Sequence, residues 1–204
     1  MSDENELIQK EPEKEESWQK GLMVYLHDLV YLLAVVMIVF LLLFRIVVVS
    51  GSSMYNTLWD GDWLLVVSNV FYGDPEYGDI IVASKESFND GEPIIKRVIA
   101  TEGQTVDIDF VNGIVYVDGV ALEEDYTYSD TTNEEGMQFP LVVEEGCVFV
   151  MGDNRGRSTD SRNPDIGQID RREILGRAVI LLFPGSGTGI FSGDRDFSRI
   201  GALK

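Results

Sequence analysis

The longest run of hydrophobic positions extends from Leu29 to Val49 and contains one charged residue, Arg45. At roughly 1.5 Å per residue, a helix of about 21 residues measures about 31 Å, close to the thickness of the hydrocarbon layer of a bilayer. No face of this helix would be polar, unlike a helix that covers a soluble core. Arg45 lies near one end, where its side chain can reach the lipid headgroups. The pattern predicts a transmembrane anchor, which we place at residues 22–49.

A cleaved signal peptide is the other interpretation of this hydrophobic run. The run is longer than the usual apolar region of a signal peptide, its upstream flank is not simply basic, and no Ala-x-Ala-like cleavage site follows it. The preceding residues 1–21 are polar and mostly acidic, with few groups able to build a core. We therefore expect a flexible acidic tail, followed by an anchor that is retained.

The distribution of basic residues predicts the orientation of this anchor. Three lysines lie in the tail, whereas no lysine or arginine follows Arg45 until Lys85. Positively charged flanks of a membrane span are retained on the cytoplasmic side. We therefore expect a single-pass protein of the cell membrane, with a cytoplasmic tail at residues 1–21 and an extracytoplasmic domain at residues 50–204.

Beyond the anchor the pattern is that of β-strands. Residues 106–110 alternate polar and apolar positions, and Asn112-Gly113 supplies the residues of a two-residue type I′ turn before a strand at 114–117. No later segment has helical periodicity. The fold class we expect is mainly β, an antiparallel sheet domain preceded by one N-terminal transmembrane helix. Further short apolar segments are predicted strands: 63–67, 79–83, 94–100, 147–151 and 177–183. The acidic stretch from Leu122 to Phe139 is expected to be a long surface excursion.

Composition restricts the chemistry that this domain can perform. His27, the only histidine, lies far from every candidate nucleophile, which argues against a Ser/His/Asp triad. Cys147 is the only cysteine, so the chain has no internal disulfide and lacks the partners of a Cys/His protease or zinc site. A side-chain nucleophile would need a lysine or a carboxylate as its base. The formal net charge of −19 argues against a nucleic-acid partner.

Two segments contain a candidate nucleophile and a candidate base. Ser53 lies two residues after Gly51. The backbone freedom of a glycine is useful where main-chain N–H groups must face an oxyanion. The alternative is that this serine-rich segment beside a glycine is only a loop. Lys96 lies in a predicted strand, on the same face as Ile94 and Val98. Burial among apolar neighbours would favour its neutral form. The alternative is an edge-strand lysine that extends into solvent.

A third segment, Gly152 to Arg162, follows an apolar strand and is dense in Asp, Asn, Arg and Ser. It could be a charged surface turn. As a functional loop, it could hold Ser158 against the lysine amine while Asp160 and Arg162 pair to maintain the loop's shape.

Together these segments resemble bacterial type I signal peptidases, membrane-bound Ser/Lys endopeptidases that remove signal peptides from exported proteins. The family's boxes occur in order from the anchor to about residue 184, which covers most of the chain. In this sequence they are Gly51–Leu58, Gly61–Val66, Gly78–Val82, Lys96–Gln104 and Gly152–Arg162.

The resemblance implies a role for each matching residue. Ser53 would be the nucleophile and Lys96 the general base, while Ser158 would hydrogen-bond the lysine amine. Supporting residues of the site would be Asp153, Asp160 and Arg162. The family further implies an antiparallel β catalytic domain at the outer membrane surface that cleaves preproteins after small residues, typically Ala-x-Ala, without a metal or other cofactor. The expected partners are signal-peptide-bearing preproteins and membrane lipid.

Three positions depart from the family's pattern. Asn56 replaces a proline, and Gln104 replaces an aspartate of the lysine box. Gly51 stands where some members carry a serine whose hydroxyl contributes to the oxyanion hole. The Ser53 N–H is then the expected donor, and the second donor is left unassigned.

Two other functions compete with this interpretation. A self-cleaving Ser/Lys repressor has a similar core, but the transmembrane span and the lack of a basic DNA-binding segment argue against it. A membrane-tethered β domain that binds extracytoplasmic partners without catalysis is the alternative from another class. The presence of Ser53, Lys96 and Ser158 argues against that alternative.

Overall fold

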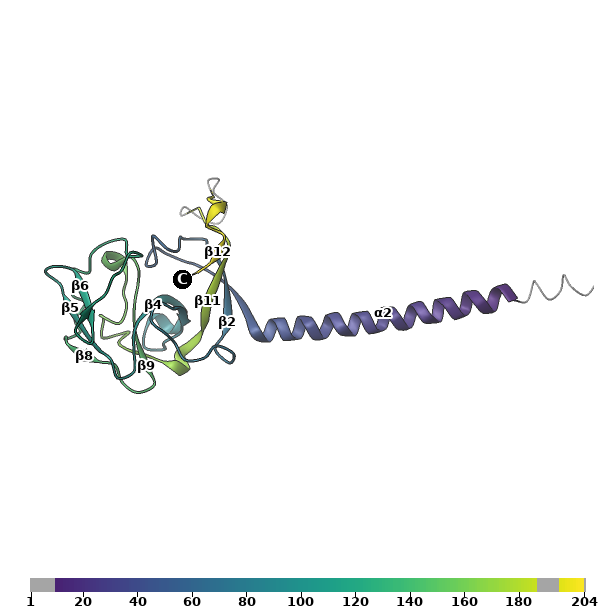
Figure 1. The fold of residues 1–204 in the computed structure, drawn as a ribbon, viewed down its shortest axis with the longest axis horizontal. Coiled ribbons are helices and arrows are strands. Elements are labelled where there is room, and N and C mark those ends of the chain that lie inside the picture. The colour runs from purple at the N-terminus through teal and green to yellow at the C-terminus, as the bar shows by residue number, and fades with distance from the viewer. Residues whose placement is uncertain (1–9, 187–194, 204) are drawn as a thin grey trace, which may run out of the picture. The chain divides into compact units, whose positions relative to one another are not determined.

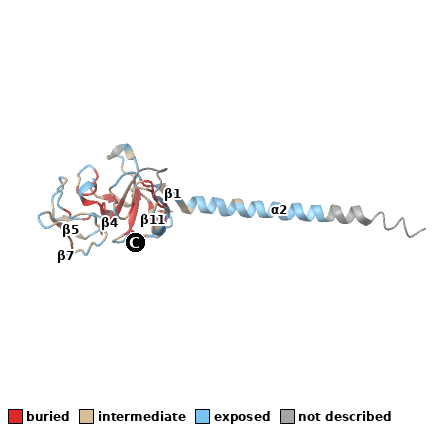
Figure 2. Ribbon diagram, turned by 90° about the horizontal axis from the view of Figure 1, so that it is seen from above, coloured by how far each residue is buried: buried red, intermediate tan, exposed pale blue. Residues whose placement is uncertain are grey.

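The computed structural model describes residues 10–186 and 195–203, of which residues 10–42 belong to one compact unit and the rest to a second (Figure 1). The first unit consists of helix α2 (Lys10–Leu43), which continues to the boundary between the two. Its segment Trp18–Leu43 is long and apolar enough to cross a membrane. Figure 2 shows exposed residues along this segment, whereas buried residues are concentrated in the β unit.

Helix α2 begins earlier than the sequence pattern predicts. Residues 10–21, expected to form part of a flexible tail, are helical, while residues 1–9 lie outside the described part of the chain. Glu, Lys and Gln have high helix propensities, and lengthening an existing helix requires no new nucleus. Pro12 falls in the first turn, where its missing N–H is not needed.

Helix α2 also ends earlier than expected, so the predicted anchor at residues 22–49 is wrong at its carboxyl end. Strand β1 (Phe44–Val48) follows the helix directly and pairs antiparallel with β2 (Trp63–Ser68). This segment is rich in β-branched residues, which pack well on a pleated surface. Arg45 is therefore exposed in a strand of the second unit, two residues after the end of helix α2.

Two antiparallel sheets form the second unit, which confirms the predicted mainly β class. The larger sheet has the order β1-β2-β11-β3-β4-β9-β10, with β12 paired to β11; the smaller has the order β7-β6-β5-β8. The remaining strands of the larger sheet are β3 (Ile80–Ala83), β4 (Ile94–Thr101), β9 (Cys147–Met151), β10 (Ile169–Asp170), β11 (Ile174–Phe183) and β12 (Gly201–Ala202). The smaller sheet contains β5 (Thr105–Asp109), β6 (Ile114–Val117), β7 (Val120–Ala121) and β8 (Leu141–Val142). Short 3-10 turns are η1 (Asn89–Gly91), η2 (Arg155–Arg157), η3 (Arg171–Glu173) and η4 (Phe197–Arg199).

The predicted strands are present, but the two-residue turn occurs at a different hairpin. Asp109 pairs with Ile114, so Asn112-Gly113 belongs to a four-residue connection. Gly113 has a positive φ, and a Cβ there would lie 2.6 Å from Cβ of Asp130. The tight turn is instead Asp118-Gly119, where both residues have positive φ. Close contact with a distant segment, rather than a type I′ turn, therefore explains this glycine.

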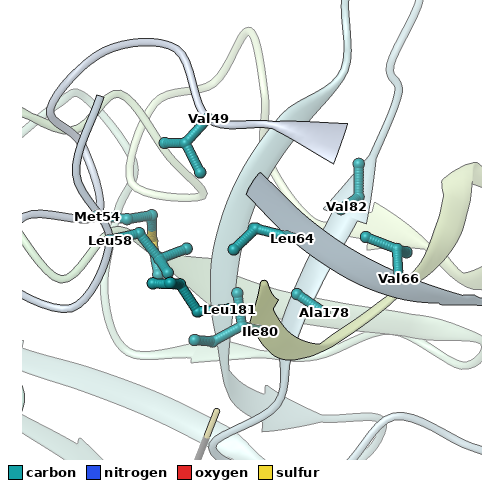
Figure 3. Packing of buried hydrophobic residues seen from close by; sticks show 9 residues of the cluster. All are labelled: Val49, Met54, Leu58, Leu64, Val66, Ile80, Val82, Ala178 and Leu181. Carbon is teal, nitrogen blue, oxygen red and sulfur yellow. The ribbon is translucent and has the colours of Figure 1, made fainter. Parts of the chain in front are cut away.

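The core beneath the larger sheet includes residues of the candidate nucleophile segment. Met54 and Leu58 are buried beside Leu64 of β2 and Leu181 of β11, and Figure 3 shows Met54 and Leu58 side by side in this cluster. Burying one such side chain stabilises the fold by about 1.5–3 kcal/mol. The segment around Ser53 is thus held by the hydrophobic core.

Candidate active site

The segment between β1 and β2 positions Ser53. The Val49 N–H donates to the Asp62 carbonyl at 2.8 Å and closes the base of the loop. The Ser53 carbonyl accepts a hydrogen bond of 2.9 Å from the Asn154 N–H, and the Asn154 side chain donates to the Ser52 carbonyl at 3.0 Å. These bonds attach the nucleophile segment to the loop that follows β9.

Lys96 reaches Ser53 from β4. Its side chain is 5% exposed, and its Nζ donates a hydrogen bond of 2.9 Å to Ser53 Oγ. Burial lowers the pKa of Lys96, an effect opposed mainly by the carboxylates of Asp160 and Glu135. The neutral amine, whose lone pair can accept the serine proton, is therefore more abundant at neutral pH than for an exposed lysine. The solvent-exposed alternative for Lys96 is wrong.

Arg97, next to Lys96, points to the other side of the strand and forms a buried ion pair. Its Nε and Nη2 donate to the two carboxylate oxygens of Asp153 at 2.9 and 2.7 Å. The Thr57 hydroxyl donates to Asp153 at 2.5 Å. Asp153 therefore connects three segments: the nucleophile segment, β4 and the loop after β9.

Removing this carboxylate should be costly. Asp153→Ala leaves the Arg97 guanidinium buried without its counterion, which typically costs about 3–5 kcal/mol of unfolding free energy. The control is Asp74→Ala, which removes a largely exposed partner of Arg171 and should cost at most about 1 kcal/mol. Denaturant unfolding of both variants in detergent measures the difference. Equal costs would contradict a structural role for the buried pair.

The loop after β9 is organised by Asp160. Its carboxylate accepts two hydrogen bonds from the Arg162 guanidinium, at 2.8 and 2.9 Å, one from the Arg162 backbone N–H at 3.3 Å, and one from the Gly152 N–H at 2.9 Å. Asp160 and Arg162 thus pair as the sequence predicted, and both are fully buried.

Two expected contacts differ in the structure. Ser158 Oγ is buried but has no hydrogen-bond partner within the described ranges, so the predicted bond to the Lys96 amine is not formed. Ser158 instead packs against Gly152, where a Cβ would lie 2.2 Å from its Oγ and 2.5 Å from the Ser53 carbonyl oxygen. Gly51 has the expected unusual geometry, with φ of 91°, but its N–H donates to Asp60 at 2.8 Å.

A groove of about 370 Å³ opens beside Ser53 and Lys96. Its lining includes the end of β1, with Val47 and Val48, and the start of β4, with Ile94 and Ile95. Seven apolar residues line the groove, together with Ser50, Ser53, Glu92 and Lys96. Within residues 10–186 and 195–203, no group of three or more His, Cys, Asp or Glu side chains is placed to hold a metal ion.

The acidic stretch between β7 and β8 contacts the site, which the sequence did not predict. Glu124 pairs with the buried Arg155 at 2.9 and 2.5 Å, Arg97 lies over the Tyr126 ring at 4.1 Å, and Glu135 lies 3.1 Å from Arg162. The prediction that this acidic stretch is only a surface excursion is therefore incomplete. The one available signal was the complementary charge of this acidic stretch and the arginine-rich loop.

Comparisons with known proteins identify relatives of this chain. The family model described as signal peptidase, peptidase S26, matches residues 22–183. A probable signal peptidase I-1 of Synechocystis sp. is 41% identical over 150 residues, which cover 69% of this chain and 72% of that protein. The signal peptidase I of Bacillus licheniformis is 31% identical over 180 residues, which cover 84% of this chain and 94% of that protein.

A crystal structure of a signal peptidase I from Enterococcus faecalis superposes with a TM-score of 0.43 at 32% identity, covering 52% of this chain and 97% of that one. The family model and the sequence relatives suffice for the assignment: this chain belongs to the signal peptidase family of serine endopeptidases, peptidase family S26.

Proposed function

We propose that this protein is a membrane-anchored peptidase that removes N-terminal signal peptides from exported preproteins by a Ser53/Lys96 dyad. The observation that carries the proposal is the 2.9 Å contact between Lys96 Nζ and Ser53 Oγ, made by a buried lysine at the base of an apolar groove. Membership of the signal peptidase family supports the same conclusion.

The proposed reaction begins with neutral Lys96. As Ser53 Oγ attacks the scissile carbonyl carbon, the Lys96 amine takes the hydroxyl proton. The Ser53 N–H stabilises the oxyanion, and the lysine ammonium then gives its proton to the leaving amine of the mature protein. The resulting acyl-enzyme is hydrolysed by a water that the same lysine deprotonates. The signal peptide leaves with a new carboxylate, and Ser53 regains its proton.

The groove favours an extended peptide with small side chains at alternate positions. Successive side chains of an extended peptide point to opposite sides, so the residues one and three places before the scissile bond face the same wall. The groove has Val47 of β1 and Ile94 and Ile95 of β4 in its lining, and these apolar side chains can contact the methyl groups of alanines in the substrate. We therefore propose cleavage after Ala-x-Ala sequences.

Helix α2 is the proposed membrane anchor. Its segment Trp18–Leu43 is apolar, and the lysines in the chain's first 21 residues support a cytoplasmic amino terminus under the positive-inside rule. Val47, a groove residue, follows Leu43 by four residues, a chain length of at most about 14 Å. Enzyme and membrane-held substrate are thereby confined to one surface, the extracytoplasmic face of the cell membrane.

Cleavage of a preprotein in detergent tests this function. The full-length protein should cut a preprotein after an Ala-x-Ala sequence, which N-terminal sequencing of the product would locate. Replacing the alanine before the scissile bond with leucine should lower the rate by about 10-fold or more, because the proposed specificity is for small side chains at this position. Absence of cleavage by the folded protein would instead favour a membrane-tethered binding domain.

A further inference from the structure

Two tyrosine rings lie beside the nucleophile, on residues that the proposed mechanism does not use. Tyr55 follows Ser53 by two residues, and its ring meets that of Tyr128 edge to face, with 4.8 Å between the ring centroids. Tyr128 belongs to the acidic stretch between β7 and β8 and is 59% exposed. The Cα atoms of Ser53 and Tyr55 are at most about 7 Å apart, a span that two residues of an extended peptide cover. The pair is therefore within reach of a peptide bound at Ser53.

The tyrosine pair lies outside the groove. Met54 is the last residue of the nucleophile segment in the groove lining, and Lys96 is the last residue of β4 in it. From Arg97 onward, β4 pairs with β9, so this edge of the strand is not available to a peptide beyond Lys96. A peptide that fills the groove up to Ser53 therefore has to continue over the nucleophile segment and the loop after β9.

The backbone of Tyr128 is held against that loop. Its N–H donates to the Asp153 carbonyl at 2.9 Å, and the next residue, Ser129, forms a parallel bridge with Asn154. The Asn154 N–H donates in turn to the Ser53 carbonyl at 2.9 Å. The exposed ring is therefore carried by a backbone that is tied to the nucleophile. A peptide that packs against this ring has less conformational entropy to overcome than one that orders a mobile loop.

Two neighbouring aromatic rings are already covered by arginines of the chain itself. Arg97 lies over the Tyr126 ring, 4.1 Å from its centroid, and Arg199 lies over the Trp59 ring at 4.3 Å. Both rings are partly buried, whereas Tyr128 is exposed. An aromatic ring offers a large contact surface, and its burial against a ligand is favourable. Tyr128 is thus the ring of this group with the most surface left to bury.

We propose that the Tyr55–Tyr128 pair binds the first residues of the mature protein, those that directly follow the scissile bond, through contact of the Tyr128 ring with their apolar atoms. This role rests on the proposed function, which assigns the groove to the residues before the scissile bond and the attack to Ser53. Continuity identifies the occupant: the same chain that fills the groove leaves past this pair. The pair contributes to recognition of the preprotein and not to proton transfer.

The test compares two substrates of the full-length protein in detergent. One is a preprotein, and the other is a synthetic signal peptide of the same sequence that ends after Ala-x-Ala in a methyl ester. When Ser53 Oγ attacks the ester, methanol leaves in place of the mature protein. Tyr128→Ala should lower kcat/KM for the preprotein by about 5-fold or more, because the ring is lost. Its kcat/KM for the ester should stay within about 2-fold of the wild-type value, because this substrate has no residues to place on the ring.

Two further variants serve as controls. Tyr128→Phe keeps the ring and should keep the wild-type kcat/KM for both substrates. Phe71→Ala removes a ring of similar exposure, 60%, from the connection between β2 and β3, and should also leave both values unchanged. If Tyr128→Ala does not fold, as judged by circular dichroism, Tyr128→Ser removes the same ring and must show the selective loss.

Equal losses on both substrates in folded Tyr128→Ala would overturn the proposal, because the ring would then act on the dyad or on the fold. A wild-type kcat/KM for the preprotein in that variant would also overturn it, as would an equal preprotein loss in Phe71→Ala. The ester separates this role from the proposed function. Hydrolysis by the wild type but not by Ser53→Ala would support the dyad even if Tyr128→Ala has no selective loss, whereas hydrolysis of neither substrate by the wild type would refute both.

Discussion

Lys96→Arg should lower kcat/KM for a preprotein by about 10³-fold or more, although it preserves the positive charge. An arginine is never deprotonated in a protein, so it cannot accept the Ser53 proton. The larger guanidinium would also have to fit a site in which the lysine is 5% exposed. Ser53→Ala should be equally inactive. Cleavage of a preprotein under single-turnover conditions measures both losses, and substantial activity in Lys96→Arg would remove Lys96 from the mechanism.

Stability should separate Lys96→Met, which removes the amine, from Ser53→Ala, which keeps it. The folded-state pKa of Lys96 is lowered from its ordinary value of 10.5, so the unfolded chain binds more protons between the two pKa values, and stability rises with pH across that interval. Below the folded-state pKa, the protein bears the full cost of a buried ammonium. Lys96→Met should therefore gain stability relative to the wild type at acidic and neutral pH, and the gain should shrink as the pH approaches 10.5.

Melting temperatures across this pH range provide the measurement. Ser53→Ala is the control, because it abolishes activity without removing the ammonium, and its stability difference from the wild type should not depend on pH in this way. A Lys96→Met difference that is constant with pH would mean that the fold does not disfavour the charged lysine.

Gly152→Ala should destroy both stability and activity by adding one methyl group. Its Cβ would lie 2.2 Å from Ser158 Oγ, 2.5 Å from Ser158 Cβ and 2.5 Å from the Ser53 carbonyl oxygen. Relieving these overlaps requires the nucleophile segment to separate from the loop after β9. Overpacking of this kind typically costs about 1–3 kcal/mol, and a displacement of the nucleophile by about 1 Å can cost 10²-fold in rate.

Gly73→Ala is the matched control for this variant. Gly73 has ordinary backbone geometry, and a Cβ there would meet no atom within 4 Å. Its unfolding free energy and cleavage rate should stay close to those of the wild type. Wild-type activity in Gly152→Ala would show that the two segments need not touch during catalysis.

Sequence patterns were sufficient where a local signal determines the structure. Alternation in β4 correctly separates Lys96 from Arg97, because strand residues point alternately to opposite faces. The assignment of Asp160 to Arg162 also follows from two residues close in sequence. Hydropathy located helix α2 but not its ends, since a β-branched apolar segment such as 44–48 resembles a continuation of a membrane helix until its pairing with β2 is known.

Contacts between segments far apart in the sequence could not be predicted from these local patterns. Glu124 and Glu135 lie 31 and 27 residues before their arginines, within a stretch of similar acidic residues, and nothing local distinguishes them from exposed neighbours such as Glu134. The same applies to Gly152, whose role depends on the contact of two segments about 100 positions apart.

With α2 as the proposed membrane anchor, the direct succession of α2 and β1 determines where the chain could be cut without damage to the peptidase unit. A chain that starts at residue 50, the boundary expected from hydropathy, would lose β1 and with it one wall of the groove, and β2 would become the edge of the sheet. A chain that starts at Phe44 would keep strand β1 and the part of the groove that β1 lines. A protease that released this unit from the proposed anchor would therefore have to cut on the helix side of Phe44 to leave the groove intact.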